Sequence, residues 1–135
     1  MGMASTSSFT GVNSNNDFIA IIREGVPKKA LDNLINSTGI SPTEIAHIIG
    51  TSDRTLRRYT SKQKLNPEQS ERIIELAKLY SRGEEVFGRI DDFNVWMNTS
   101  LTALGNKKPK EYMDTSIGID LLMNEIGRIE HGIFA

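Results

Sequence analysis

The sequence predicts an all-α fold built from two small helical modules. Apolar residues recur three and four positions apart along most of the chain after Asp17, which is the spacing of one helix face. No segment of useful length alternates apolar and polar residues as a half-buried strand does. Glycine and proline interrupt the pattern at short intervals, which is typical of short helices joined by tight turns. We therefore expect a bundle of short helices followed by a smaller helical domain.

Length and composition exclude several classes of site. The chain has 135 residues, no cysteine and two histidines, so it lacks the ligands of a thiolate zinc site or an iron–sulfur cluster. Hydrophobic residues make up 38% and charged residues 24%, as in an ordinary globular domain. No apolar run approaches the roughly 18 residues of a membrane span, and no secretory signal is recognised. We expect a cytoplasmic protein with no membrane partner, no metal and no cofactor.

The formal net charge of −1 hides a division along the chain. Residues 17–64 carry a net charge of +3, residues 65–83 are neutral, and residues 84–135 carry −4. Such an asymmetry suggests a basic surface for one partner and an acidic surface for another.

The first sixteen residues, 1–16, are mostly Ser, Thr, Asn and Gly, and this composition predicts a disordered tail. The short apolar run from Phe18 to Ile22 follows, and its pattern fits either a strand or a helix.

Two helices are predicted next from their start and stop signals. Pro27 suits the first turn of one helix, and Gly39 suits the left-handed residue after its end. Ser41-Pro42-Thr43-Glu44 then has the pattern of a capping box with proline at the first helical position. This second helix should stop at Gly50.

Three further helices complete the prediction. Ser52 should cap a third helix that runs to about Tyr59, and residues 66–83 should form a fourth that ends at Gly83. Beyond it, one amphipathic helix is predicted over Val86, Ile90, Phe93 and Met97, and a last helix over 119–132. We place the domain boundary near Gly83, with one domain over 17–83 and another over 84–135.

The helices at 41–49 and 52–59 have the proportions of a helix-turn-helix, whose second helix reads DNA. Ala46 should let the two helices cross closely, Gly50 can take the positive φ of the turn, and Leu56 should bury the middle of the second helix. The outward residues are then mostly basic or hydroxyl-bearing, types that bind guanine edges and phosphates. The predicted DNA-binding residues are Thr51, Ser52, Asp53, Arg54, Thr55, Arg57, Arg58 and Lys62.

Five basic residues and one acidic residue lie between Thr51 and Lys64, so DNA binding should be sensitive to salt. Specific affinity usually requires two recognition helices about one DNA turn apart. We therefore expect a homodimer or a larger hetero-oligomer on double-stranded operator DNA. The alternative is that the Arg-rich helix is only a solvated face.

The acidic half shows no catalytic constellation. His47 lies inside the second predicted helix, where we expect a partly buried packing residue. His131 stands beside Glu130, but no nucleophile or third metal ligand lies at a recognisable spacing. We predict that the chain has no catalytic residue and is not an enzyme.

The chain end is apolar, with Ile133 and Phe134 among its last residues. Disorder is usual at a terminus unless something covers it, so these residues should dock either on this domain or on a partner. The alternative for the polar residues before them is an i, i+3 surface pair between Glu125 and Arg128, followed by a C-cap at Gly132.

These residues resemble a known family. The C-terminal segment resembles the toxin-binding C-terminal domain of the Xre/MbcA/ParS antitoxins, and the N-terminal segment is similar to the Xre-like helix-turn-helix found upstream in that family. The resemblance covers about 18–135. In the C-terminal domain it rests on Val86-Phe87-Gly88, Trp96-Met97, Leu104-Gly105, Pro109, Asp114-Thr115, Gly118 and 127–132, and in the N-terminal domain on 25–27 and 52–58.

The resemblance implies a type II antitoxin whose toxin has a RES domain, a fold that consumes NAD or transfers groups from it. It implies that the C-terminal domain blocks the active-site cleft of the toxin, while the N-terminal half binds operator DNA and represses the operon. Trp96 lies in the matching pattern, and an acidic domain suits a basic nucleotide pocket. The predicted toxin-binding residues are Trp96, Arg128, Glu130, His131, Gly132, Ile133 and Phe134.

One position departs from the family pattern. Lys110 and Glu111 follow the proline where apolar residues are usual, which puts the contact surface there in doubt. A second hypothesis is a stand-alone helix-turn-helix repressor whose C-terminal domain only dimerises.

Overall fold

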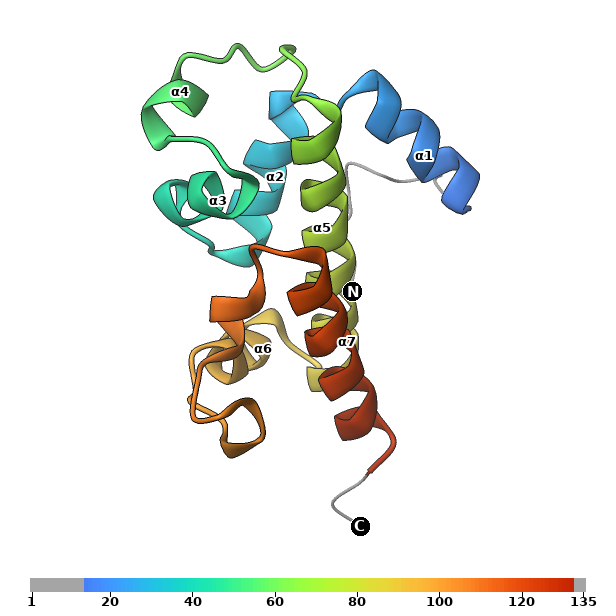
Figure 1. Cartoon of the computed structure of the whole chain (residues 1–135), viewed down its shortest axis with the longest axis vertical. Helices are drawn as coiled ribbons and strands as arrows, with labels where there is room; N and C mark the ends of the chain where they lie inside the picture. The colour runs from blue at the N-terminus through green and yellow to red at the C-terminus, as the bar shows by residue number, and fades with distance from the viewer. Residues whose placement is uncertain (1–13, 133–135) are drawn as a thin grey trace.

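The computed structural model describes residues 14–132, and its regular elements are helices (Figure 1). Within this range two isolated bridges join extended residues, and no strand is formed. The all-α prediction is confirmed. The elements are α1 (Asn15–Glu24), α2 (Lys28–Thr38), α3 (Pro42–Ile49), α4 (Asp53–Arg57), α5 (Pro67–Phe87), α6 (Ile90–Met97), the short 3-10 turns η2 (Thr102–Leu104) and η3 (Pro109–Tyr112), and α7 (Ser116–Glu130).

Helix α1 resolves the ambiguous apolar run near the N-terminus. Ser14 caps it by accepting a hydrogen bond from the Asp17 amide at 3.2 Å, so residues 14–16 are ordered rather than part of a disordered tail. The rest of the predicted tail lies outside the described residues. The helix packs on α5, where the Lys78 ammonium lies 4.2 Å from the centroid of the Phe18 ring. None of its residues is fully buried.

The predicted cap residues are present at the end of α2, at both ends of α3 and at the start of α5. Pro27, however, is the N-cap residue of α2 rather than a residue of its first turn, and at α3 the bond from the Glu44 amide to Ser41 forms one half of the predicted capping box. Gly39 and Gly50 are left-handed at the ends of α2 and α3, and the Ser41 hydroxyl accepts a hydrogen bond from the Glu44 amide at 3.1 Å. Asn66 and Gln69 form the full reciprocal capping box at the start of α5. A cap depends on residues within one turn of the helix end, which is why these helix ends can be predicted from the sequence.

The end predicted for α5 at Arg82-Gly83 is wrong. The helix continues to Phe87, and Gly88, with φ of 87°, ends it. Gly83 is instead a contact point inside the helix, because a Cβ atom there would lie 2.5 Å from the ring of Phe93. The single amphipathic helix predicted over 86–97 is correspondingly divided at Gly88, and α6 begins at Ile90.

An aromatic cluster joins α6 to α5 at this contact. The Phe93 ring is fully buried and meets Tyr80 edge-on, with ring centroids 5.1 Å apart. It also stacks on Trp96 at 5.7 Å and contacts Phe87 at 5.5 Å. Burial raises the pKa of Tyr80 well above its ordinary value, so the phenol stays neutral at any physiological pH.

One continuous core runs through both halves of the chain, from Val26 to Ile126. Helix α5 forms its axis and packs against α1, α2, α3, α6 and α7. A polar clamp adds to the contact with α7: the Arg72 guanidinium donates to Glu75 at 2.8 Å and to the Ser116 hydroxyl at 3.1 Å, and Ser116 donates to Glu75 at 2.8 Å. No helix within residues 14–132 is long and apolar enough to span a membrane.

We predict that Gly83→Ala destabilises the protein by about 1–3 kcal/mol, because its Cβ would overlap the Phe93 ring in a packed core. Gly127→Ala, inside α7, is the matched control. No atom lies within 4 Å of its added Cβ, so the higher helix propensity of alanine should stabilise the protein by about 0.5–1 kcal/mol. Urea unfolding measures both changes. Equal effects of the two substitutions would contradict the packing role of Gly83.

Candidate functional site

The helix-turn-helix predicted over 41–59 is present in α3, α4 and the turn between them. The Thr51 amide donates to the Ala46 carbonyl at 2.9 Å, and Gly50 takes a φ of 81° in the turn. Ile45 and Ala46 are buried on α3, and Leu56 is buried on α4. These are the inward positions expected from the sequence, so the remaining face of α4 points outward.

The recognition helix is shorter than predicted. It spans Asp53–Arg57, and the chain leaves it before Tyr59 because the next residues pair with the start of α2. The Lys29 amide donates to the Ser61 carbonyl at 2.9 Å, and the Leu65 amide donates to the Val26 carbonyl at 2.8 Å. Gly25 is required beside this crossing, because a Cβ there would lie 2.6 Å from the Leu65 carbonyl oxygen.

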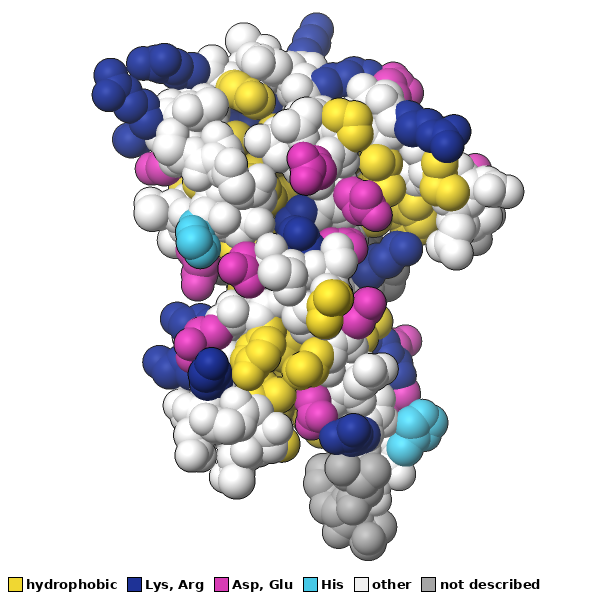
Figure 2. All heavy atoms as spheres, in the orientation of Figure 1, with side chains coloured by type: hydrophobic (Ala, Val, Ile, Leu, Met, Phe, Trp, Pro, Cys, Tyr) yellow, Lys and Arg dark blue, Asp and Glu magenta, His cyan; other side chains and the backbone are white. Residues whose placement is uncertain are grey.

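The outward face of α4 and the segment after it is basic. Figure 2 shows dark-blue side chains gathered over α4. Arg54, Arg58 and Lys62 are exposed, and within the described part of the chain no ion pair joins them. These three cations are therefore available to a partner without first breaking a salt bridge.

Two other cations of this region are already paired. Arg57 lies 3.5 Å from the Asp53 carboxylate one turn earlier on α4, and Lys64 pairs with Glu24 at the end of α1. Asp53 thus orients Arg57, whose side chain is 73% exposed. The basic surface at α4 therefore contains four outward cations, Arg54, Arg57, Arg58 and Lys62. Lys64 is not one of them, because it pairs with Glu24 of α1.

Hydroxyl groups at the start of α4 serve the helix itself. The Ser52 hydroxyl accepts from the Thr55 amide at 3.0 Å and donates to the Thr55 hydroxyl at 2.9 Å. Both residues are exposed, whereas Thr51 is half-buried. In the free protein the N-cap is therefore closed, and a phosphate would have to compete for it.

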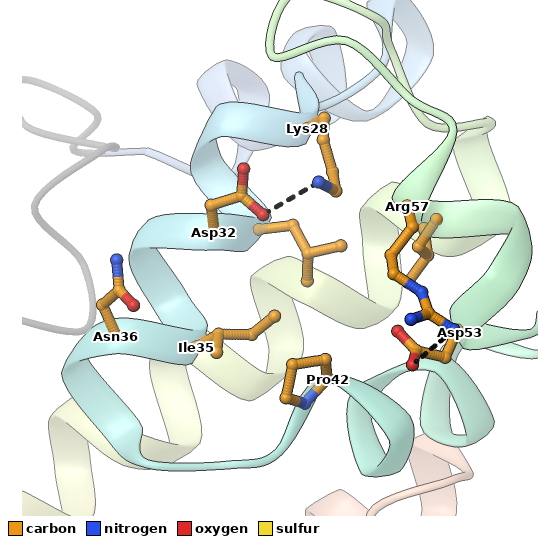
Figure 3. A pocket seen from close by; sticks show the side chains of 9 residues that line it. Lys28, Asp32, Ile35, Asn36, Pro42, Asp53 and Arg57 are labelled. Carbon is orange, nitrogen blue, oxygen red and sulfur yellow. Dashed lines mark ion pairs between the residues drawn. The ribbon is translucent and has the colours of Figure 1, made fainter.

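A pocket of about 380 Å³ lies between α2 and α4 (Figure 3). Ile35 and Pro42 lie on its apolar side. The Lys28–Asp32 pair, 3.0 Å apart, lies on one rim, and the Asp53–Arg57 pair of α4 lies on another. Both ion pairs are internal to their own helices, and the buried Leu56 of α4 also lines the pocket.

The second candidate surface is the end of α7. Arg128 forms the i, i+3 pair with Glu125 at 2.8 Å that the sequence allows as an alternative, and its side chain is 60% exposed. Glu130 turns the other way and forms an ion pair with Arg82 of α5. That pair lowers the pKa of Glu130 and raises the pKa of Arg82, so both groups are charged at neutral pH.

Of the remaining predicted toxin-binding residues that the structure describes, some are exposed to solvent and one is packed in the aromatic cluster. His131 is exposed, with its Nε2 atom 3.9 Å from the Glu130 carboxylate, and Gly132 takes a φ of 68° after the helix. Ile133 and Phe134 lie outside the described residues. Trp96 is half-buried in the aromatic cluster, 5.6 Å from Phe87 between ring centroids, so only part of its ring is open to a partner.

The two surfaces lie at opposite ends of the long axis of the molecule (Figure 1). Helix α4 lies near one end, and α7 points its last turn toward the other.

Comparison with known proteins shows the family of the chain. Residues 17–78 match the antitoxin Xre-like helix-turn-helix domain, and residues 82–132 match the antitoxin Xre/MbcA/ParS C-terminal toxin-binding domain. Antitoxin Xre of Photorhabdus laumondii is 34% identical over 116 residues, which cover 84% of this chain and 78% of that protein. The chain belongs to the Xre family of antitoxins.

Two further relatives extend the comparison of this Xre antitoxin. The Prs ADP-ribosylating antitoxin of a Sphingobium species is 27% identical over 129 residues, covering 88% of this chain and 81% of that protein. A chain in the crystal structure of the MbcT–MbcA toxin–antitoxin complex of M. tuberculosis has the same fold, with a TM-score of 0.56 at 22% identity over 92% of this chain and 100% of that one.

The Xre antitoxin is thus the antitoxin of a toxin–antitoxin system, with a C-terminal toxin-binding domain. Its family consists of antitoxins rather than enzymes. Within residues 14–132, no group of three His, Asp or Glu side chains could hold a metal ion. His47, expected to be a partly buried packing residue, is exposed instead, because it lies on the outer face of α3.

Sequence reasoning missed Arg82 as a residue of the C-terminal surface. Its partner Glu130 is 48 positions away, and no local pattern links two residues at that separation.

Proposed function

We propose that this Xre antitoxin neutralises a RES-domain toxin, which consumes NAD or transfers groups from it, by placing the end of α7 in the toxin's active-site cleft. We propose further that it represses its own operon by binding operator DNA through α4. The observation that carries both proposals is the placement of a basic recognition helix and a toxin-binding helix end at opposite ends of one continuous core. One chain can therefore hold both partners at once.

The match of residues 82–132 to a toxin-binding domain supports the first proposal. The Sphingobium relative is named for an ADP-ribosylating activity, and ADP-ribosyl groups come from NAD. A pocket for NAD must accommodate a diphosphate, which calls for positive charge. The net charge of −4 over residues 84–135 favours association with such a pocket.

At the α7 surface we propose that the predicted residues contribute unequally to toxin binding. Arg128 and His131 are exposed at the helix end and suit direct contact with the toxin. The half-buried Trp96 lies in α6, at the side of the same domain. The proposed set of residues that determine toxin binding remains Trp96, Arg128, Glu130, His131, Gly132, Ile133 and Phe134, with Glu130 paired to Arg82 in the free protein.

The exposed cations of α4 support the second proposal. Arginine can donate two parallel hydrogen bonds to a guanine edge, and lysine can neutralise phosphate. The proposed DNA-binding residues are Thr51, Ser52, Asp53, Arg54, Thr55, Arg57, Arg58 and Lys62. Since α4 has five residues, it covers a single half-site. We propose that operator binding uses a homodimer or a larger assembly with the toxin.

We predict that the double substitution Arg54→Ala, Arg57→Ala weakens binding to the promoter duplex at least tenfold, because each bidentate contact to guanine contributes about 1–3 kcal/mol. The slope of log affinity against log salt should become shallower by about 0.9 for each phosphate that the variant no longer neutralises. Titration of the promoter duplex by fluorescence anisotropy at several salt concentrations measures both effects.

Arg89→Ala is the control for this measurement, since Arg89 is exposed and paired with Asp91 in the other half of the chain. It should leave DNA affinity unchanged. Toxin neutralisation should survive the α4 double substitution. Unchanged DNA affinity in the double variant would contradict the proposal that α4 binds the operator.

We predict that deletion of residues 128–135 abolishes protection against the toxin and leaves DNA binding within about twofold of the full chain. The deletion removes the last turn of α7 but retains Ile126, which is fully buried in the core. Growth of cells that co-express the neighbouring toxin gene measures protection, and anisotropy measures DNA binding. Cells that remain protected by the shortened chain would show that the end of α7 does not block the toxin.

The same co-expression tests the stand-alone repressor hypothesis. If the neighbouring gene product is harmless when expressed alone, or remains toxic beside the full-length chain, neutralisation of that product is excluded and the repressor hypothesis gains support.

A further inference from the structure

Arg82 joins the two longest helices of the C-terminal half. Its side chain lies on α5, is 28% exposed, and donates to two carboxylates at once. Glu85, one turn later on the same helix, accepts from Nη1, and Glu130, the last residue of α7, accepts from Nη2. The bond to Glu85 fixes the orientation of the guanidinium relative to α5. The bond to Glu130 then fixes the end of α7 relative to that guanidinium.

The last turn of α7 has few other anchors. Ile126 is fully buried, but Ile129 is only half-buried, and Arg128 is engaged with Glu125 of its own helix. Among the charged side chains described at this end, Glu130 is the one that crosses to another helix. The chain then turns at Gly132, which takes a φ of 68° directly after this last turn.

Glu130 faces α5 in the free protein, and the exposed His131 lies beside it, with its Nε2 atom 3.9 Å from the Glu130 carboxylate. The Oε1 atom of Glu130 already accepts a charge-assisted hydrogen bond from Arg82, so a toxin group that used this oxygen would have to compete with Arg82. An intact pair holds the helix end in one orientation before the toxin arrives. Binding then requires less loss of conformational freedom at the interface.

We propose that Arg82 is a positioning residue of the toxin-binding end: its ion pair with Glu130 fixes the last turn of α7, and Glu130 acts through Arg82 rather than by contact with the toxin. This inference rests on the proposed function, in which the end of α7 enters the toxin. It assigns a role in toxin affinity to a residue of α5, 46 positions before Arg128.

A double-mutant cycle tests the pair in the full-length chain. Arg82→Ala, Glu130→Ala and the double variant are titrated with the purified toxin from the neighbouring gene by calorimetry. Each single substitution should weaken toxin affinity about five- to tenfold, and the double variant should be no weaker than either single one. The exchanged pair Arg82→Glu, Glu130→Arg should recover affinity to within about twofold to threefold of the native chain.

Glu85→Ala is the matched control, because it removes the other carboxylate on the same guanidinium without touching α7. It should change toxin affinity by less than about twofold. All variants should retain native affinity for the promoter duplex, which a general loss of the fold would abolish. If Arg82→Ala lowers both affinities, the exchanged pair decides: recovery of toxin affinity supports the positioning role, and no recovery overturns it.

Three results would overturn the inference. Additive effects of Arg82→Ala and Glu130→Ala would mean that Glu130 contacts the toxin independently. An unchanged affinity of Arg82→Ala would remove its role while leaving the proposed function intact, provided that deletion of 128–135 abolishes binding. A loss in Glu85→Ala as large as that in Glu130→Ala would show that the contact within α5 matters as much as the one to α7. Full toxin binding by the 128–135 deletion would instead refute the proposed function itself.

Discussion

The packing of the Phe93 ring against the backbone of α5 at Gly83 is the contact on which the rest of the structure depends. It requires the absence of a side chain at Gly83, since even a Cβ would lie 2.5 Å from the ring. The contact places α6 directly on α5, and Tyr80 and Trp96 close around the ring. From α6, the Asn94 amide donates to the Thr38 carbonyl at the end of α2, 2.8 Å away. The two matched domains therefore share one core and one uninterrupted helix.

This shared core fixes the spacing of the two candidate surfaces. Helix α5 packs against α3 of the helix-turn-helix and against α7, so the distance between the α4 surface and the end of α7 is set by a single element (Figure 1). Exposed cations gather over α4 (Figure 2), and the sequence of residues 84–135 carries a net charge of −4. Opposite signs are thus separated between the two halves, which suits the two proposed partners.

The sequence predictions fail where the outcome depends on residues that are distant in the chain. Gly83 is predicted to end a helix because glycine commonly follows a helix end. Glycine also permits close helix packing, and only the position of Phe93 distinguishes the two uses. The predicted recognition helix extends beyond α4, since the backbone pairing that draws the chain toward α2 is not encoded locally. His47 is expected to face inward, whereas the inward positions of α3 are occupied by Ile45 and Ala46.

By itself the sequence determined the helical class, the caps at Ser41, Ser52 and Asn66, the turn at Gly50 and the outward cations of α4. Each of these depends on residues within one or two helical turns of one another, where capping and periodicity act. Only the tertiary structure decided that α5 runs through both halves and that Arg82 reaches Glu130. Those features join residues that are far apart in the chain, and their geometry follows from how the helices pack rather than from any local pattern.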